Sequence, residues 1–409
     1  MIAFNAISQL VSLGGILLLQ TIYMIIVARV LGPEDFGRFS FAWSIIHVML
    51  VGGALGLNNT ALRKISANRD RSAEISQTIF WLRTILALAQ FGIILTIAYL
   101  LPESTETRGM VAIFGIGFAI HSICLSMNVV YQAHGKLYLA SINGFVVFGG
   151  HAIIGLIILL FGGRLIALST AYLAASVVGF ALNVILFPKT VHAFRIKRHD
   201  LWREQIRESV PVGLGAFFHS LTSRTAIALL LFISGPLETG IYSAASRIPF
   251  VLRNVPHAFL AAVIPVMAAH QERAATVRRL FKKSSIIMLT MAVPLTIVFF
   301  VFARPLILLL YGEQYEASIV NLRILSWTII PMFAGIAFSH VVLSQDHLVK
   351  VVPWINGIGF VTVVTAGLTL IPRFGDKGAA YSVLITYCVI AIGYFLATRR
   401  FLFQRLKEK

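Results

Sequence analysis

The chain opens on a long apolar stretch, SQLVSLGGILLLQTIYMIIVARV, at residues 8–30. This one stretch already indicates the fold class, because about 20 consecutive apolar residues let an α-helix cross the hydrocarbon core of a bilayer. Its only charged residue is Arg29, next to its end. No basic segment precedes the apolar run, so we predict a transmembrane helix that is retained and not removed as a signal peptide.

Eleven further apolar stretches follow along the chain. The twelve predicted spans are residues 8–30, 39–57, 76–101, 110–131, 138–160, 165–187, 210–234, 241–266, 286–310, 319–343, 349–371 and 378–398. Hydrophobic residues make up 58% of the sequence and charged residues 12%, whereas a soluble domain has about 25% charged residues. The sequence therefore predicts an all-α integral membrane protein with twelve transmembrane helices and no soluble domain.

The charge of the chain is strongly positive, with a formal net charge of +18. In a soluble protein this would suggest nucleic-acid binding. Of the 34 lysines and arginines, 22 are assigned to one side of the predicted spans, 7 to the other and 5 to span interiors, with Arg29, Arg304 and Lys350 counted on the side of the nearer span end. Such a bias marks the cytoplasmic side of a membrane protein. We therefore expect both termini in the cytoplasm and no nucleic-acid partner.

The sequence offers little for metal or nucleotide chemistry. Cys124 and Cys388 both lie in apolar stretches, so neither a disulfide framework nor a cysteine-based metal site is predicted. No Gly-x-x-x-x-Gly-Lys-Ser/Thr motif occurs, so ATP hydrolysis by this chain is not expected. We predict no cofactor, no metal and no catalytic residue.

The two halves of the sequence resemble each other. GPEDFGRFS at residues 32–40 matches GPLETGIYS at residues 235–243, and six predicted spans separate the copies. Later pairs, 213 residues apart, are Ile142-Asn143-Gly144 with Ile355-Asn356-Gly357, Phe161-Gly162 with Phe374-Gly375, and Ser169 with Ser382. An even number of spans means that the halves run parallel, an arrangement found in transporters. The alternative is a duplicated bundle without transport activity.

This duplication predicts the domain organisation. Residues 1–187 would form an N-terminal six-helix bundle, and residues 210–409 would form a C-terminal one. Between them, residues 188–209 form a basic cytoplasmic linker with Trp202. Such a segment is typical of an amphipathic helix on anionic headgroups, although an ordinary connector would have the same composition.

Three segments resemble those of bacterial polysaccharide flippases. They are VARVLGPEDFGRFS at residues 27–40, LYGEQY at 310–315 and IPRFGDKGAA at 371–380. The resemblance covers essentially the whole chain and implies the multidrug/oligosaccharidyl-lipid/polysaccharide exporter superfamily. Its members have a MATE-like fold, with two six-helix bundles around a central cavity, and work by alternating access.

The same resemblance implies a function. Flippases of this family move a lipid-pyrophosphate-linked oligosaccharide from the inner to the outer leaflet of the cytoplasmic membrane for polysaccharide biosynthesis. The expected partners are a polyprenyl-pyrophosphate-linked glycan, membrane lipids and polysaccharide polymerase or assembly proteins. The implied location is the bacterial cytoplasmic membrane, as a multi-pass protein that is not an enzyme.

Charged residues inside the spans point to an anionic ligand. All 16 acidic residues fall in loops or at span ends, whereas five arginines lie within spans: Arg83, Arg224, Arg247, Arg253 and Arg323. Arg83 and Arg323 are expected to reach the membrane surface. A central arginine costs about 2.5–3.5 kcal/mol on insertion scales. We expect Arg224, Arg247 and Arg253 to bind a pyrophosphate; the alternative is that they bond backbone carbonyls or face water.

Polar residues at helical spacing predict the walls of a cavity. Ser44 and His47 share a stripe in the second span, and Ser243, Arg247 and Asn254 form the matching stripe in the eighth. Gln20 and His219 are further candidate lining residues. The spans also hold His121, His151 and His340. A lone histidine in a membrane helix is more often a hydrogen-bonded packing residue than a proton carrier.

Two other functions compete with the flippase. The first is an ion-coupled exporter of small molecules or drugs with the same fold, and the lack of carboxylates within the spans argues against it. The second is a membrane glycosyltransferase or polysaccharide polymerase. The short outer loops hold only scattered acidic residues for such chemistry.

Overall fold

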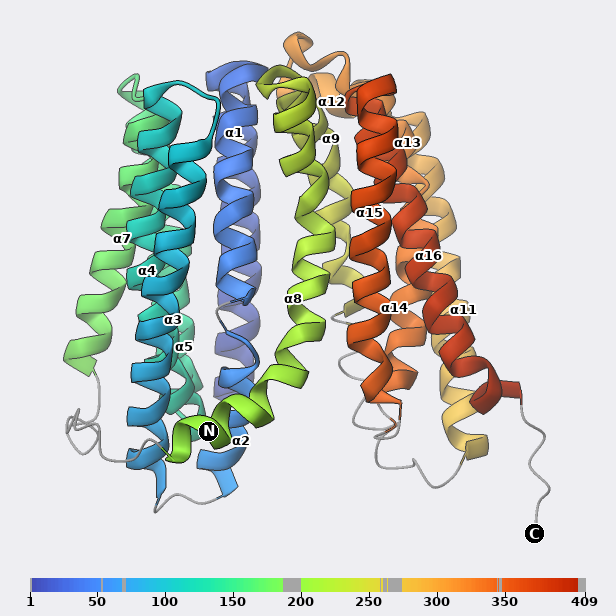
Figure 1. Ribbon diagram of the computed structural model, residues 1–409. Coiled ribbons are helices and arrows are strands. Elements are labelled where there is room, and N and C mark those ends of the chain that lie inside the picture. The colour runs from blue at the N-terminus through green and yellow to red at the C-terminus, as the bar shows by residue number, and fades with distance from the viewer. Residues whose placement is uncertain are drawn as a thin grey trace. The chain divides into compact units, whose positions relative to one another are not determined.

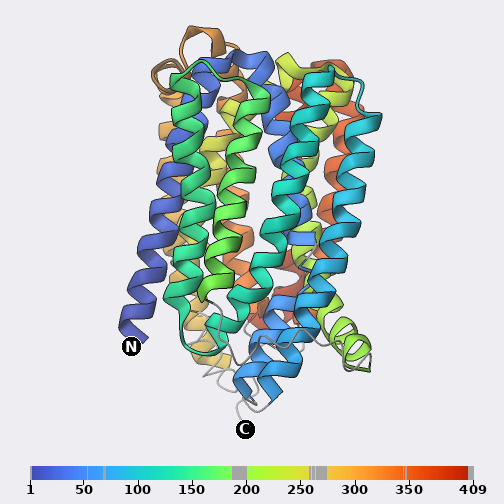
Figure 2. The same ribbon diagram turned by 90° about the vertical axis from the view of Figure 1, so that its left-hand side faces the viewer.

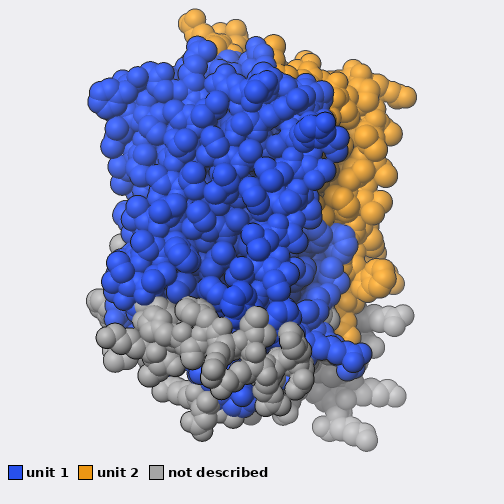
Figure 3. Space-filling model, turned by 60° about the vertical axis from the view of Figure 1, so that its left-hand side comes forward, with its two compact units in different colours: residues 1–220 blue, residues 221–409 orange. Residues whose placement is uncertain are grey.

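Helices build the computed structural model, and no strand occurs in the part of the chain that it describes (Figure 1). The structure describes residues 2–52, 54–67, 71–186, 200–257, 259, 263, 274–343, 345 and 348–403. In these residues, ten helices are long and apolar enough to cross a membrane. The predicted all-α membrane class is confirmed. Contacts divide the chain into two compact units, Met1–Ser220 and Leu221–Lys409 (Figure 3).

The first unit is a bundle in which α4 packs along both α3 and α7, and Figures 1 and 2 show these helices side by side. Its elements are α1 (Ile2–Gly52), α2 (Leu57–Ala67), α3 (Ser72–Leu100), α4 (Thr105–Ala133), α5 (Leu137–Gly144), the π-helix η2 (Phe145–Gly149), α6 (Gly150–Leu160) and α7 (Leu165–Leu186). The long helix α8 (Asp200–Ser234) begins in this unit and continues into the second.

The second unit is also a helical bundle, in which α16 packs along α14 and α15. After the end of α8 it contains α9 (Pro236–Leu252), α11 (Ala274–Val301), α12 (Ala303–Tyr311), the short 3₁₀ helix η4 (Glu313–Tyr315), α13 (Ser318–Ser326), α14 (Ile329–Leu343), the 3₁₀ helix η5 (Val349–Val351), α15 (Val352–Phe374) and α16 (Asp376–Phe403). The arginines of interest lie on α8 and α9 and in the turn that follows α9.

The predicted spans coincide with helices, except where a break falls inside an apolar stretch. Predicted span 8–30 and the larger part of span 39–57 lie in α1, which is interrupted at Gly32 and ends at Gly52. The span predicted at 241–266 begins in α9, but α9 ends at Leu252, one turn after Pro249. The spans predicted at 286–310 and 319–343 are each divided into two helices, at Phe302 and at residues 327–328. The count of twelve is therefore approximate.

The predicted linker is only partly described. Residues 188–199 lie outside the described residues, and residues 200–209 are the first turns of α8, continuous with the following span. The expected contact of Trp202 with lipid headgroups remains a prediction.

The backbone confirms that the two GP motifs are equivalent. Gly32 has φ 79° and ψ 171°, and Gly235 has φ 89° and ψ −179°. Each glycine is followed by a proline, which begins a helix favourably because its φ is already helical and it has no N–H to satisfy. Only glycine adopts this positive φ without steric cost. The two matching sequences therefore form turns with the same backbone conformation.

The second set of matched residues is equivalent as well. Gly162 and Gly375 both have positive φ, 77° and 56°. The buried hydroxyls of Ser169 and Ser382 each donate to the carbonyl three residues before, at 2.6 and 2.8 Å. The two halves are thus similar in the conformation of their turns and also in the hydrogen bonds of these serine side chains.

Gly235 allows a test of the turn without a packing complication. No atom lies within 4 Å of the position that a Cβ would take, so alanine is disfavoured by the positive φ alone. We expect Gly235→Ala to lower the unfolding free energy by about 1–3 kcal/mol, measured by thermal unfolding in detergent.

Gly14 is the control for that substitution. It also has open space around its Cβ position but lies inside α1 with helical backbone. Gly14→Ala should be neutral or stabilise by up to about 1 kcal/mol. Equal destabilisation by both alanines would contradict the conformational explanation.

The first-loop motif of the flippase resemblance is an ion-pair cluster around Arg38. Its guanidinium donates to Glu34 at 2.7 Å, to Asp35 at 2.8 Å and to Glu103 at 2.9 Å. Glu103 follows α3, so the cluster ties the turn in α1 to the loop between α3 and α4. The acidic residues of this motif therefore serve the structure and are not free to bind a cation.

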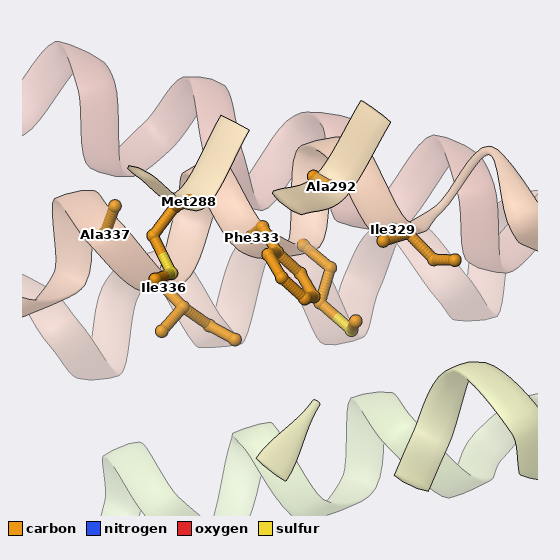
Figure 4. Close-up of a cluster of buried hydrophobic side chains, with 7 residues drawn as sticks. Met288, Ala292, Ile329, Phe333, Ile336 and Ala337 are labelled. Carbon is orange, nitrogen blue, oxygen red and sulfur yellow. The ribbon is translucent and has the colours of Figure 1, made fainter. Parts of the chain in front are cut away.

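Packing inside the second unit is apolar. Met288 and Ala292 of α11 lie against Ile329, Phe333 and Ile336 of α14, as Figure 4 shows, and all are at least nine-tenths buried. Other large apolar residues are exposed, as at Leu160 (85%), Phe161 (88%) and Ile185 (78%). Large exposed apolar surface is unfavourable in water but matches lipid tails. The outer faces of the helices thus fit a membrane environment.

The beginning of α8 is fastened to α2 within the first unit. A Cβ at Gly213 would lie 2.1 Å from the Leu55 carbonyl carbon, so the two backbones touch. One turn earlier, Ser209 and Thr60 share a hydrogen bond of 2.5 Å. Beyond it, Lys64 donates to Glu204 at 2.7 Å, and this bond holds the pKa of Glu204 below its usual range.

Candidate functional site

The second unit brings two of the predicted arginines onto one aromatic ring. The Cζ atom of Arg224, on α8, lies 4.4 Å from the centre of the Phe250 ring, and that of Arg253 lies 4.5 Å from it. Phe250 is on α9, and Arg253 follows in the turn after α9. Cation–π contacts of this length are attractive, by about 0.5–2 kcal/mol. Phe250 therefore holds two like charges close together.

Arg247 completes a group of three positive charges. The charges of Arg247 and Arg253 both act on Arg224, and Arg247 also lies near the Tyr311 phenol. All three arginines are partly buried. Within the described residues, neither Arg224 nor Arg247 has a hydrogen bond or an ion pair. We call Arg224, Arg247, Arg253 and Phe250 the arginine cluster.

The acidic residues of this unit are engaged elsewhere or lie apart along the chain. Asp376 accepts a hydrogen bond from Asn321 at 2.6 Å, and Glu316 pairs with Arg304 at 3.3 Å. Glu238 is in the first turn of α9, nine residues and so about 13 Å along the helix from Arg247. Within the described residues, neither Arg224 nor Arg247 therefore has a carboxylate partner.

This arrangement is suited to an anion. The guanidinium N–H groups of Arg224 and Arg247, which make no hydrogen bond within the described residues, can bind phosphate oxygens in pairs. Among the described residues, no three His, Cys, Asp or Glu side chains lie close enough together to hold a metal ion. The chemistry on offer is thus anion binding in a partly buried setting.

The predicted cavity-lining residues of the first unit have different surroundings. Gln20 donates to the Phe148 carbonyl at 2.6 Å, and the buried Ser44 hydroxyl donates to the Ser40 carbonyl at 2.7 Å. His47 and His219 are partly buried, and the ring of His47 lies 5.3 Å from that of Trp43. None of these placements tests a contact with substrate, so their role remains a prediction.

Two predicted lining residues lie on or beside α9. The Ser243 hydroxyl is buried and has no hydrogen-bond partner in the described part of the chain, which is also true of its repeat counterpart Ser40. Asn254 is exposed and donates to the Val251 carbonyl at 3.0 Å. Their expected place on the wall of a cavity between the halves remains a prediction.

The expectation that Arg83 reaches the membrane surface is wrong. Arg83 is fully buried, about 16 Å along α3 from its first residue. It donates to Asn58 at 2.8 Å and to Ser122 at 3.4 Å, and its Nε has no partner among the described residues. Asn58 is in the first turn of α2 and Ser122 lies on α4. The two side chains that accept hydrogen bonds from the Arg83 guanidinium therefore come from helices that are distant in sequence.

Arg83 thus carries a buried charge bonded to two neutral side chains. Burying a charge costs several kcal/mol of desolvation, and methionine, with a side chain of similar length, removes that charge while filling most of the same space. Asn58 is only partly buried, so its amide can bind water after the change. We expect Arg83→Met to leave thermal stability in detergent unchanged or raised. A loss of about 3 kcal/mol or more would show instead that the charge is compensated in the folded state.

Phe250 was not predicted as part of the site. Its spacing is a usable signal, since it lies three residues after Arg247 and three before Arg253. Whether an aromatic residue stacks on an arginine depends, however, on the neighbouring helix, which here brings Arg224 to the same ring.

Comparison with known proteins identifies the family of this chain. The profile of the family described as "Polysaccharide biosynthesis protein" matches residues 2–271, about two thirds of the chain. The chain belongs to this polysaccharide biosynthesis family. A relative from Escherichia coli (strain K12), named "Putative O-antigen transporter", is 23% identical over 404 residues, which cover 94% of each chain.

Solved structures support the predicted MATE-like fold for this family member. An inward-facing multidrug resistance MATE family transporter of the MOP superfamily superimposes with a TM-score of 0.80, at 17% identity, over 94% of both chains. A MOP superfamily transporter from Pyrococcus furiosus, described as having a binding pocket of reverse polarity, gives a TM-score of 0.67 at 15% identity, over 97% of this chain and 94% of that one. The predictions of the flippase family and of a membrane transporter fold are confirmed.

Proposed function

We propose that this protein is a flippase that moves a lipid-pyrophosphate-linked oligosaccharide from the inner to the outer leaflet of the bacterial cytoplasmic membrane by alternating access. The arginine cluster is the observation that carries the proposal. It gathers three guanidinium groups, two of them on one ring, and within the described residues neither Arg224 nor Arg247 has an ion pair. A pyrophosphate supplies the missing negative charge and fits the guanidinium edges.

The rest of the substrate fits a protein path through the membrane. Sugar hydroxyls lose hydrogen bonds to water in hydrocarbon, at a cost of several kcal/mol each. A polar route inside the protein avoids that cost, while the lipid chain stays among the lipid tails. The name of the Escherichia coli relative, which refers to O-antigen, also favours a glycan as cargo.

The orientation we propose has both termini in the cytoplasm. It rests on the uneven distribution of lysine and arginine, 22 of 34 on the side of the termini, and on the positive-inside rule. Polysaccharide polymerase or assembly proteins would then meet the product on the opposite side of the membrane.

A reconstituted system tests the function. The purified protein is placed in liposomes with a synthetic polyprenyl pyrophosphate that carries a fluorescent disaccharide, and a membrane-impermeant quencher reports the fraction in the outer leaflet. Faster exchange between leaflets than in protein-free liposomes, with the lipid recovered unchanged by mass spectrometry, is the expected result. Hydrolysed or extended glycan would point to an enzyme instead.

The same liposomes separate a flippase from a drug exporter of this fold. A positively charged site repels cationic compounds, so a fluorescent cationic dye should not be transported. Dye transport without movement of the glycan lipid would overturn the proposal and favour the exporter.

A further inference from the structure

We propose that Glu238, Asn321 and Asp376, in the second unit, bind a calcium ion. The site lies at the N-terminal ends of α9 and α16, apart from the arginine cluster. The proposal does not depend on the flippase function, because it concerns a structural ion and not the cargo. We call these three residues the carboxylate–amide site.

Three helices of the second unit bring these residues together. Glu238 is in the first turn of α9, Asn321 is on α13 and Asp376 is the first residue of α16. The three helices pack against one another. The Asn321 amide donates to the Asp376 carboxylate at 2.6 Å. The Glu238 carboxylate lies against Gly375, so closely that a Cβ on this glycine would overlap it. Because Gly375 directly precedes Asp376, the two carboxylates are neighbours.

The carboxylate–amide site contains buried oxygen atoms without partners. Asn321 is fully buried, and its Oδ1 has no hydrogen-bond partner in the described part of the chain. The same holds for the buried Oε2 of Glu238. Neither Glu238 nor Asp376 forms an ion pair with a described residue, and the basic residues nearest to them in sequence, Arg373 and Lys377, are exposed. Buried oxygens without partners call for an explanation, and a bound cation supplies one.

The sequence repeat shows which group is missing from this site. Asp35 of the first half corresponds to Glu238, 203 residues later, and it pairs with the guanidinium of Arg38 at 2.8 Å. The residue that corresponds to Arg38 is Ile241, whose apolar side chain has no charge. Residues three apart are neighbours on the surface of a helix. The first half therefore neutralises its carboxylate with its own arginine, whereas the second half takes a cation from solution.

Calcium suits this set of ligands. It binds about six to eight oxygen atoms of carboxylates, amides and water in a flexible arrangement, whereas magnesium demands a near-ideal octahedron. Its two positive charges also match the two carboxylates. Glu238 and Asp376 are partly exposed, so the ion can enter from water and keep some water ligands. No three His, Cys, Asp or Glu side chains of the described residues form a metal site, and here the Asn321 oxygen takes the place of a third such ligand.

The bound ion would fasten the start of α9 to α13 and α16. Since α9 also carries Arg247 and Phe250 of the arginine cluster, the ion stabilises the helix that holds the candidate anion site. In the orientation proposed above, residues 235–240 follow the seventh predicted span and so face outward. Calcium sites of extracellular modules have dissociation constants of about 0.1–1 mM, and we expect an affinity in this range.

Calcium binding to the purified full-length protein tests the proposal. Thermal unfolding in a non-ionic detergent is compared between about 10 mM calcium chloride and EDTA, at constant ionic strength. We expect calcium to raise the melting temperature by about 3–10 °C, the shift for a ligand at about 10–100 times its dissociation constant. Calorimetric titration with calcium chloride should give one site per chain. No shift, or an equal shift with sodium or magnesium chloride, overturns the calcium site.

Three variants locate the ion. Glu238→Gln removes a charge and Asn321→Leu removes the amide oxygen, and each should weaken calcium binding at least about tenfold, or about 1.4 kcal/mol. Ile241→Arg places a guanidinium where the first half has one. It should raise the melting temperature in EDTA and abolish the response to calcium. Each response is a difference between two conditions, so a variant with lower basal stability remains informative.

Glu316→Gln is the matched control. Glu316 belongs to the same unit but already has an arginine partner at 3.3 Å, so its loss should leave calcium binding unchanged. If Glu238→Gln responds to calcium like the wild type, or Ile241→Arg keeps the full response, the ion is not at the carboxylate–amide site and the proposal fails. The attraction of carboxylates to helix N-termini would then account for Glu238 and Asp376. The liposome assay separates this result from the flippase, since calcium binding is measured without transport.

Discussion

Alanine in place of Arg224 is expected to slow flipping of a polyprenyl-pyrophosphate-linked glycan by about 10- to 100-fold, since a charge-assisted hydrogen bond contributes about 1.5–3 kcal/mol. Arg224 has no hydrogen bond or ion pair within the described part of the chain, so removing it breaks only its stacking on Phe250. Arg247→Ala should have a loss of similar size. Lysine at either position should restore part of the rate, because it keeps the charge but not the paired N–H edges.

Arg323→Ala is the matched control for these variants. Arg323 belongs to the same unit and also lies over an aromatic ring, 5.9 Å from the centre of Phe300, but it is exposed. Its loss should leave the flipping rate unchanged. The binding of inorganic pyrophosphate to detergent-solubilised protein, measured by calorimetry, gives a readout that does not depend on transport. Normal flipping and normal pyrophosphate binding in Arg224→Ala and Arg247→Ala would refute the arginine cluster as the anion site.

The double variant Arg224→Ala/Arg247→Ala shows whether one anion is shared. Residues that bind the same group are energetically coupled, by about 0.5–3 kcal/mol, whereas independent residues have additive effects. We expect the double variant to be less impaired than the product of the two single losses. Strict additivity would place the two arginines at separate steps of transport.

Valine in place of Gly213 is expected to lower the unfolding free energy by about 3 kcal/mol or more, at the upper end of the cost of overpacking. A Cβ there would lie 2.1 Å from the carbonyl carbon of Leu55 and 2.5 Å from the nitrogen of Gly56. Both are backbone atoms, so no side chain can turn away to make room. The start of α8 would have to separate from α2.

Gly92→Val is the matched control for that prediction. Gly92 lies in the interior of α3, is exposed and has no atom within 4 Å of its Cβ position. Valine there should change stability by less than about 1 kcal/mol, as expected from helix propensity. Thermal unfolding of both variants in the same detergent provides the comparison. Equal melting temperatures would show that α2 and the beginning of α8 can separate at little cost.

The membrane fold could be predicted closely because its signal is local. A stretch such as residues 165–187 is apolar along its whole length, and the observed helix α7, Leu165–Leu186, has almost the same bounds. The break at Phe302 was missed although Arg304 and Pro305 follow it closely, and the break at residues 327–328 was missed although Pro331 lies shortly after it. A helix can stop inside an apolar stretch when its neighbours satisfy the freed backbone groups, and those neighbours are remote in sequence.

The candidate site was predictable only in its charges. An arginine inside an apolar stretch is visible in the sequence, and this identified Arg224 and Arg247. The partner of each arginine is not visible. Arg224 meets Phe250 of another helix, and Arg83 meets Asn58 and Ser122; for Arg83 the prediction was therefore wrong.

Three properties can be inferred from the amino-acid sequence alone. The chain is a membrane protein, its two halves are similar to each other, and arginines lie inside the predicted spans while all acidic residues lie in loops or at span ends. Each of these follows from the composition of short stretches, because the cost of moving a residue from water to hydrocarbon depends mainly on that residue. Only the folded structure shows which charges stack on aromatic rings and which are fully enclosed. Those properties depend on groups brought together from distant helices, and no local pattern encodes them.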